Sequence, residues 1–147
     1  MVIISRYKII SREEKAGIVQ KVLSYEESFC PKCKETLKPV GSRIRALYLV
    51  DGKKIRIRIR RLYCEKCRRI HHEFPDMVIP YKRYDISSVY HIISGLKMEV
   101  GCDEKTAEHI LRWWMRISKY ARSIKSMDDF KRSIKEIDPL LLKDKGR

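Results

Sequence analysis

Four of the five cysteines fall into two pairs with the same spacing, Cys30-Pro31-Lys32-Cys33 and Cys64-Glu65-Lys66-Cys67. A two-residue spacer lets a tight turn aim both sulfurs at one ion, and two such turns supply four ligands at the corners of a tetrahedron. The spacing therefore predicts a structural zinc site made of Cys30, Cys33, Cys64 and Cys67. A disulfide framework would need an oxidising compartment, and a rubredoxin-like iron centre would use the same four ligands.

Three other residues near the pairs or of the same type need separate consideration: His71, His72 and Cys102. His71 and His72 follow the second pair closely and are possible substitutes for one cysteine, although four cysteines already complete a zinc shell. Cys102 has no Cys or His at metal spacing, so we expect it to be a buried structural thiol. The residue after each pair is Lys34 or Arg68, where glycine is common because the backbone turns left-handed there.

Positive charge is concentrated between and after the cysteine pairs. The 147-residue chain has 34 Lys and Arg against 19 Asp and Glu, a net charge of +15 with a pI near 9.8. Residues 43–72 alone hold eleven Lys and Arg but only two acids. A solvated face would mix both signs, so this run favours contact with nucleic-acid phosphates. The residues predicted to make it are Arg56, Arg58, Arg60, Arg61, Arg68 and Arg69.

The segment between the pairs has the pattern of a β-hairpin. Asp51-Gly52 is a turn signal, and the alternation of Ile55, Ile57 and Ile59 with arginines predicts a return strand with one apolar face. A hairpin joining two cysteine turns is the architecture of a zinc ribbon. Ahead of it, residues 1–4 are expected to form a short strand, and Ser11-Arg12-Glu13-Glu14 matches a capping box that predicts a helix over 12–24.

Helical periodicity returns after residue 84. We expect a helix from Asp85 or Ser87 to about Gly95, a turn over 97–101, a helix over 104–123 capped by Asp103, and a last helix from Ser126 that buries Phe130, Ile134 and Ile137. Residues 140–147 are expected to be a frayed tail.

The helix over 104–123 has a basic outer face, and Trp113 at its border is expected to pack inward. A short helix followed by such a helix suggests a helix-turn-helix with its second helix in the major groove. The predicted contact residues there are Lys105, Thr106, His109, Arg112, Arg116 and Lys119.

These elements predict an α+β protein: a small four-cysteine zinc ribbon built on a β-hairpin with an N-terminal helix, followed by a helical helix-turn-helix-like bundle. The expected divisions are an N-terminal strand and helix segment (1–29), the ribbon and a linker (30–83), the helix-turn-helix-like domain (84–125), and a C-terminal helix and tail (126–147). No apolar run reaches the roughly 18 residues of a membrane span, so we expect a cytoplasmic protein with no membrane contact.

Two segments of the sequence resemble a known family. The first segment is similar to a poorly characterised family of small bacterial proteins. It reads Arg60-Arg61-Leu62-Tyr63-Cys64-x-x-Cys67-x-x-Ile70-His71-His72-Glu73-x-Pro75-Asp76-x-x-Ile79-Pro80-Tyr81-Lys82-Arg83-Tyr84, with Cys30-Pro31-x-Cys33 upstream. The second segment resembles a helix of that family and consists of Asp103-Glu104-Lys105-Thr106 and Arg112-Trp113-Trp114. The spacing between these two parts is longer here than in the family. The family pairs a zinc ribbon with a helix-turn-helix and is similar to the N-terminal DNA-binding regions of insertion-sequence transposases. The resemblance implies DNA binding linked to mobile elements.

The sequence thus predicts a zinc-dependent protein that binds duplex DNA and has no catalytic activity. Four cysteines leave no open position on a zinc ion, and many of the acids lie at helix starts rather than in a cluster that would bind Mg²⁺. The alternative is a ribbon adaptor that docks on a transposase or another protein, or binds RNA. In the RNA case Tyr48, Tyr63 and Phe74 would stack on unpaired bases.

Overall fold

The computed structural model describes residues 1–143 and contains six strands followed by a group of helices. The strands are β1 (Val2–Ile4), β2 (Tyr7–Glu14), β3 (Gly17–Ser24), β4 (Lys38–Tyr48), β5 (Lys54–Cys64) and β6 (Arg69–Pro75). The helices are α1 (Ile86–Ile93), α2 (Glu104–Ile117), α3 (Met127–Glu136) and α4 (Pro139–Leu142), with 3-10 turns η1 (Lys97–Glu99) and η2 (Ser118–Tyr120). Strands hold 37% of the residues and helices 29%.

The chain divides into two compact units. The strand unit comprises Met1–Leu47 and Ile55–Asp76, and the helical unit comprises Tyr48–Lys54 and Met77 onward. The tip of the β4–β5 hairpin therefore belongs to the helical unit. In residues 1–143 no helix is both long and apolar enough to cross a bilayer.

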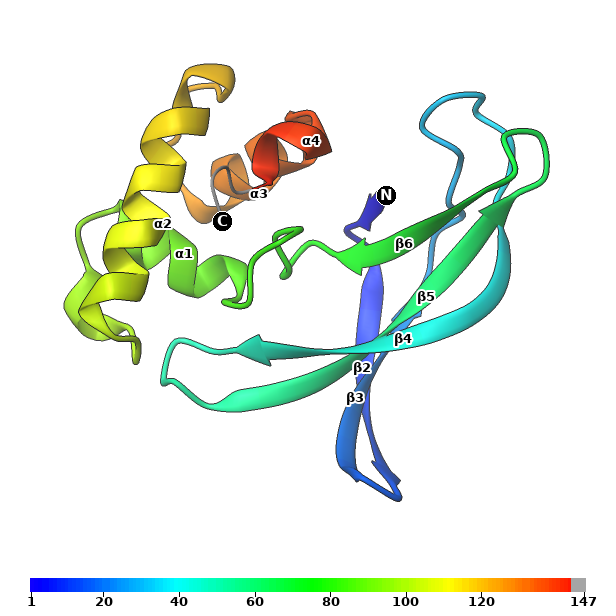
Figure 1. Cartoon of the computed structure of the whole chain (residues 1–147), viewed down its shortest axis with the longest axis horizontal. Coiled ribbons are helices and arrows are strands. Elements are labelled where there is room, and N and C mark those ends of the chain that lie inside the picture. Colours follow the sequence, from blue (N-terminus) through cyan, green and yellow to red (C-terminus); the bar gives the residue numbers. More distant parts are fainter. Residues whose placement is uncertain (144–147) are drawn as a thin grey trace. The chain divides into compact units, whose positions relative to one another are not determined.

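The strand unit is a curled six-stranded sheet in the order β1-β6-β5-β3-β2, with β4 also paired to β5 (Figure 1). β1 and β6 run parallel, as do β3 and β5, whereas β2–β3 and β5–β6 are antiparallel. The predicted alternation on β5 holds over Ile57 and Ile59, which are both buried. It shifts by one residue at Arg60-Arg61, since Leu62 and Cys64 are the next buried positions.

The predicted N-terminal helix is wrong. Residues 7–24 form the β2–β3 hairpin, in which Ser11 lies opposite Gln20 and donates from its hydroxyl to the Gln20 side-chain oxygen over 2.8 Å. The Ser11 side chain is therefore bonded across the hairpin and does not cap a helix. Several β-branched residues in the segment favour strands, and Gly17 at φ +114° lets the chain turn between them. The expected short strand at the N-terminus is confirmed as β1.

The ribbon hairpin is present, but it is part of a larger sheet. β4 and β5 flank the predicted turn, where the Gly52 amide donates to the Leu49 carbonyl and Gly52 has φ +84°. The predicted small ribbon with an N-terminal helix is thus replaced by a six-stranded sheet that contains the ribbon as β4, β5 and β6.

The helical unit has its core between α1, α2 and α3. Asp85 caps α1, Asp103 caps α2 and Ser126 caps α3, as the sequence predicted. Phe130, Ile134 and Ile137 are buried as expected, and so is Trp113, whose indole N–H donates to the Leu142 carbonyl over 2.8 Å. That bond holds α4, where the sequence suggested a frayed tail; residues 144–147 of that predicted tail lie outside the described part of the chain.

The helix-turn-helix-like description is also wrong. α1 and α2 pack together, but residues 94–103 connect them through η1 and an extended segment. The connection in a helix-turn-helix is only three or four residues long. α2 also ends at Ile117 and not near residue 123.

Candidate metal centre and nucleic-acid interface

The two cysteine pairs sit on equivalent turns. The Lys34 amide donates to the Cys30 carbonyl over 2.9 Å, and the Arg68 amide donates to the Cys64 carbonyl over 2.8 Å. Both closing residues are left-handed, with φ +65° at Lys34 and φ +54° at Arg68. The second turn joins β5 to β6, so the sheet fixes its position.

The sheet brings the four sulfurs to one point. The Sγ atoms of Cys33 and Cys64 are 3.4 Å apart, those of Cys30 and Cys67 are 3.8 Å apart, and all four lie within 4.8 Å of one another. A disulfide requires about 2.05 Å, whereas a tetrahedron with metal–sulfur bonds of about 2.3 Å has edges of about 3.8 Å. The four cysteines can therefore hold one metal ion.

The thiol pKa values of the cluster differ from one cysteine to another. Backbone hydrogen bonding, chiefly from Cys33, lowers the pKa of Cys30 to about 6 against the opposing effect of burial. Hydrogen bonding to Cys33 and burial raise the pKa of Cys67 to about 12. Cys30 and Cys64 are buried in a small core with Leu37 and Leu62. Sulfurs that share protons in this way release them when a metal ion binds.

His71 lies beside the cysteine cluster. Its Nε2 is 3.8 Å from Cys30 Sγ, and burial, followed by positive charges that include Arg69 and Lys32, lowers its pKa. The four cysteines form the metal-binding group without it. Cys102 belongs to the helical unit, where it is partly buried and burial raises its pKa.

Three of the predicted phosphate-binding arginines are bound by the protein itself. Arg56 donates to the Ala16 carbonyl, and Arg58 donates to Ser42 and pairs with Glu14. Arg60 makes two 2.8 Å bonds to the carboxylate of Glu73, which is 2% exposed and also accepts from Ser28. These side chains hold the sheet together.

The other predicted arginines of the strand unit face different surroundings. Arg61 lies directly opposite His72 in the β5–β6 pairing, and Arg68 and Arg69 are exposed beside the second cysteine turn. Burial lowers the pKa of His72, and the next contributions come from Arg43 and Arg61, with a smaller one from Arg45. The Arg45 guanidinium also lies 5.6 Å from the centre of the Phe74 ring.

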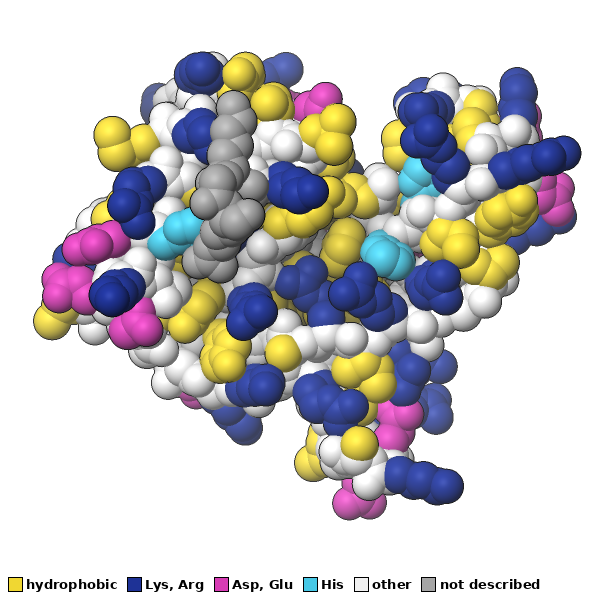
Figure 2. Space-filling view, viewed as in Figure 1, with side chains coloured by type: hydrophobic (Ala, Val, Ile, Leu, Met, Phe, Trp, Pro, Cys, Tyr) yellow, Lys and Arg dark blue, Asp and Glu magenta, His cyan; other side chains and the backbone are white. Residues whose placement is uncertain are grey.

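We call Arg43, Arg45, Arg61, His72 and Phe74 the arginine face. Sequence reasoning missed the contributions of Arg43, Arg45 and His72 to it. The alternation Arg43-Ile44-Arg45 in a predicted strand is the signal that could have found the first two. Figure 2 shows Lys and Arg side chains far outnumbering Asp and Glu over the strands. The strand unit has 17 Lys and Arg against eight acids, a net charge of +9.

The predicted face of α2 is divided by the structure. Lys105, Arg112 and Lys119 are exposed, whereas Thr106 and His109 are partly buried and line a pocket. Arg116 donates to the carbonyls of Leu141 over 3.1 Å and Lys143 over 2.8 Å, so it holds the end of α4.

Comparison with protein families gives a match. The model of a domain of unknown function, DUF6431, matches residues 30–113, more than half of the chain. The chain belongs to the DUF6431 family. The matched range contains both cysteine pairs, the arginine face, α1 and most of α2, and it leaves out the β2–β3 hairpin, α3 and α4. Comparisons with curated proteins and with solved structures give no match.

Proposed function

We propose that this protein binds duplex DNA through the arginine face and that a structural zinc ion holds that face together. The gathering of arginines beside His72 and Phe74 carries the proposal: Arg61 lies opposite His72, the Phe74 ring packs edge-on to His72, and the Arg45 guanidinium lies 5.6 Å from the centre of the Phe74 ring, while Arg43 and Arg61 both contribute to the lowered pKa of His72. Like charges held close together cost free energy in the isolated protein, and the phosphates of a nucleic acid offset that cost. The net charge of +9 in the strand unit acts in the same direction.

Zinc is the metal that fits the cysteine cluster best. Four sulfurs within 4.8 Å of one another supply a full set of zinc ligands, which favours a structural ion and leaves no position for a substrate. We therefore propose a binding protein without catalysis. Iron would use the same ligands, and elemental analysis of the purified protein separates the two. One zinc per chain is expected, and a coloured iron protein would contradict the assignment.

The exposed basic residues of α2 and of the turn after it provide a second proposed contact. Lys105 and Arg112 are exposed on α2, and Lys119 is exposed in η2, where they suit phosphates or the major groove. The resemblance to transposase DNA-binding regions gives this proposal its biological setting, a cytoplasmic protein that acts with mobile elements or with a transposase.

The proposal is tested by the salt dependence of DNA binding. Fluorescence anisotropy of the zinc-loaded protein with a labelled duplex would be measured from about 50 to 200 mM salt, where phosphate contacts dominate affinity. The triple variant Arg43→Gln, Arg45→Gln, Arg61→Gln should bind more weakly and lower the slope of log K against log salt by up to about three units. The matched control is Arg6→Gln, Arg12→Gln, Lys15→Gln, which removes the same charge from exposed positions of the same unit.

The control variant should stay close to the parent protein in both affinity and slope. If both triple variants weaken binding equally, only net charge matters and the arginine face has no special role. If the parent protein does not bind DNA at about 50 mM salt, DNA binding is refuted and the adaptor function takes its place.

A further inference from the structure

A pocket in the helical unit has a lining suited to one nucleotide. It has a volume of about 260 Å³ and is lined by Tyr48, Tyr81, Lys82, Arg83, Tyr84, Thr106, His109 and Ile110. Three tyrosines line the pocket together with Arg83 and His109, no carboxylate is among the lining residues, and the Lys82 ammonium lies 4.7 Å from the centre of the Trp113 ring. This lining is complementary to a neutral planar ring attached to an anionic group. Pockets for drug-sized ligands span about 300–1,000 Å³, so this one fits a single small ring system.

The walls of the pocket are held by backbone pairing. The Tyr48 amide donates to the Arg83 carbonyl over 2.8 Å, and the Asp85 amide donates to the Tyr48 carbonyl over 2.9 Å. The rings of Tyr48 and Tyr84 stack with their centres 5.2 Å apart. Thr106 and His109 come from the first turns of α2. The pocket is therefore built on paired backbone and a helix.

Tyr81 is the observation that points to a ligand. It has φ +70°, and the Lys82 amide donates to the Ile79 carbonyl over 3.0 Å, which closes a turn over Ile79-Pro80-Tyr81-Lys82. With proline second, this is the turn type whose third position normally requires glycine. A bulky residue there is strained. The Tyr81 side chain is nevertheless 44% exposed at the pocket, so core packing does not account for it.

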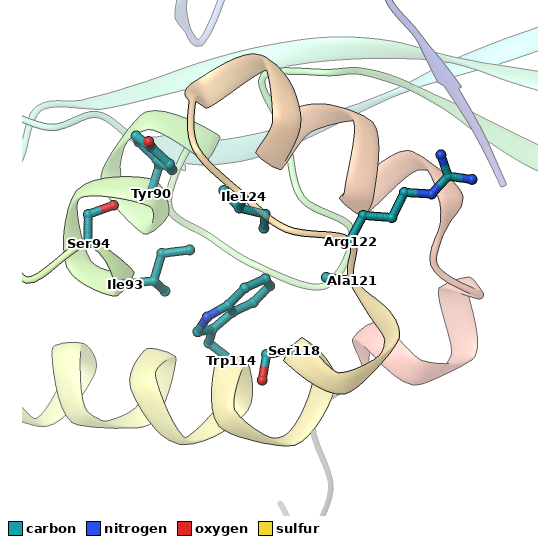
Figure 3. A pocket seen from close by; sticks show the side chains of 8 residues that line it. All are labelled: Tyr90, Ile93, Ser94, Trp114, Ser118, Ala121, Arg122 and Ile124. Carbon is teal, nitrogen blue, oxygen red and sulfur yellow. The ribbon is translucent and has the colours of Figure 1, made fainter.

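A second cavity lacks these features. It has a volume of about 310 Å³ and lies between α1, α2 and the segment before α3, lined chiefly by Tyr90, Ile93, Trp114 and Ile124 (Figure 3). Its one charged side chain, Arg122, points away from the cavity and pairs with Glu136 over 3.4 Å. No strained residue lines it, since Tyr81 is the only strained non-glycine residue of the described helical unit.

We propose that the Tyr81 pocket binds one nucleotide whose base is unpaired. Tyr81 stacks on the base, and Arg83 and His109 face its phosphate. The nucleotide can be part of a strand, in which case the inference rests on the proposed nucleic-acid binding, or it can be a free mononucleotide. In a strand, stacking of one base on tyrosine should raise affinity by roughly five- to 150-fold.

The test uses the full zinc-loaded chain and photoreactive 5-iodouracil probes. The probes are a duplex with one bulged 5-iodouracil, the same duplex with that base paired, and free 5-iodouridine monophosphate. The bulged probe should bind more tightly than the paired probe and crosslink to Tyr81, Tyr48 or Tyr84 on irradiation. Tyr81→Gly and Arg83→Gln should each abolish the preference. The matched control is Tyr25→Ala, which removes a ring that is 61% exposed in the strand unit.

Tyr81→Gly is informative because glycine relieves the strain of the turn. The variant should be at least as stable to heat as the parent protein, so lost binding cannot be ascribed to unfolding. Crosslinking of the free nucleotide alone, lost in Tyr81→Gly, supports the pocket and assigns it to a mononucleotide. Equal affinity for both duplexes with no crosslink in the pocket overturns this inference and leaves the proposed DNA binding intact. Absence of binding to all three probes overturns both.

Discussion

At the residue scale, the ion pair between Glu73 and Arg60 shows what the arginine-rich strand does. Glu73 lies almost fully inside the strand unit and accepts two bonds from Arg60 and one from Ser28. A buried carboxylate that loses a charged partner is costly, whereas removing both partners together costs much less. Arg60 therefore stabilises the folded strand unit, and its bonds to Glu73 occupy the side chain that was predicted to bind phosphate.

Glu73→Gln should lower the free energy of unfolding by about 3 kcal/mol, because it leaves the Arg60 guanidinium without its counter-charge. This value is the lower end of the range of free energies lost when a buried ion pair is broken, and we use it because the Arg60 side chain is 36% exposed. Denaturant unfolding of zinc-loaded protein measures the change. The matched control is Glu65→Gln, which breaks an exposed pair with Lys38 and should cost no more than about 0.5 kcal/mol. A loss below about 1 kcal/mol for Glu73→Gln would mean that the pair contributes little.

The sequence locates the cysteine cluster far better than it locates the partners of the arginines. The spacing of the four cysteines is a local signal, and the sheet only has to bring two turns together. The fate of Arg58 and Arg60 depends on Glu14 and Glu73, which belong to other strands. Alternation shows which residues share a face, but it does not reveal the acid that a distant strand supplies.

At the element scale, the two cysteine turns carry a strain that glycine would remove. Lys34 and Arg68 both adopt left-handed backbone, which costs a residue with a side chain about 1–2 kcal/mol. Each turn is closed by a backbone hydrogen bond, which the Lys34 amide donates to the Cys30 carbonyl and the Arg68 amide donates to the Cys64 carbonyl. The same strain in both turns suggests that side chains at these positions serve another purpose, such as neutralising the charge of the sulfurs.

Lys34→Gly should raise the free energy of unfolding by about 0.5 kcal/mol, since relief of strain exceeds the greater entropy of glycine in the unfolded chain. Lys32→Gly, one residue before Cys33 and without a positive φ, is the control and should destabilise the protein by a similar amount. Thermal unfolding in excess zinc measures both. If Lys34→Gly is the less stable of the two variants, the account of the turn is wrong.

The β2–β3 hairpin shows why element prediction failed in one place and succeeded in others. The capping-box pattern at Ser11 is a local signal, and cross-strand pairing with Gln20 overrides it. The caps at Asp85, Asp103 and Ser126 were predicted correctly, because each is followed by a helical apolar pattern whose buried residues lie in one unit. The segment after Ser11 contains β-branched residues that favour a strand, and the pairing of β3 with β5 stabilises that strand.

At the scale of the whole molecule, the two units should respond differently to loss of metal. The cysteine cluster lies in the small core of the strand unit, whereas the helical unit buries Phe130, Ile92 and Trp113 in a core of its own. Metal binding adds its free energy to the folding of the unit that contains the ligands.

Chelation of the metal should therefore unfold the strand unit first. In amide NMR spectra of the full chain, dispersed signals of β4, β5 and β6 should be lost after addition of a strong chelator, while signals of α1, α2 and α3 persist. Returning zinc should restore them. Cys102→Ser serves as the control and should behave as the parent protein, because Cys102 is outside the metal-binding group. Unchanged strand signals after complete metal removal would show that the ion is dispensable for folding.

The central claim, that the arginine face receives the phosphates of DNA, is tested most directly by mapping the contact on the protein. Amide and arginine side-chain NMR shifts of the zinc-loaded chain would be followed during titration with a short duplex at about 50 mM salt. The largest changes should fall on Arg43, Arg45 and Arg61 and on their neighbours in β4, β5 and β6. A duplex that binds but leaves these strands unperturbed would contradict the account.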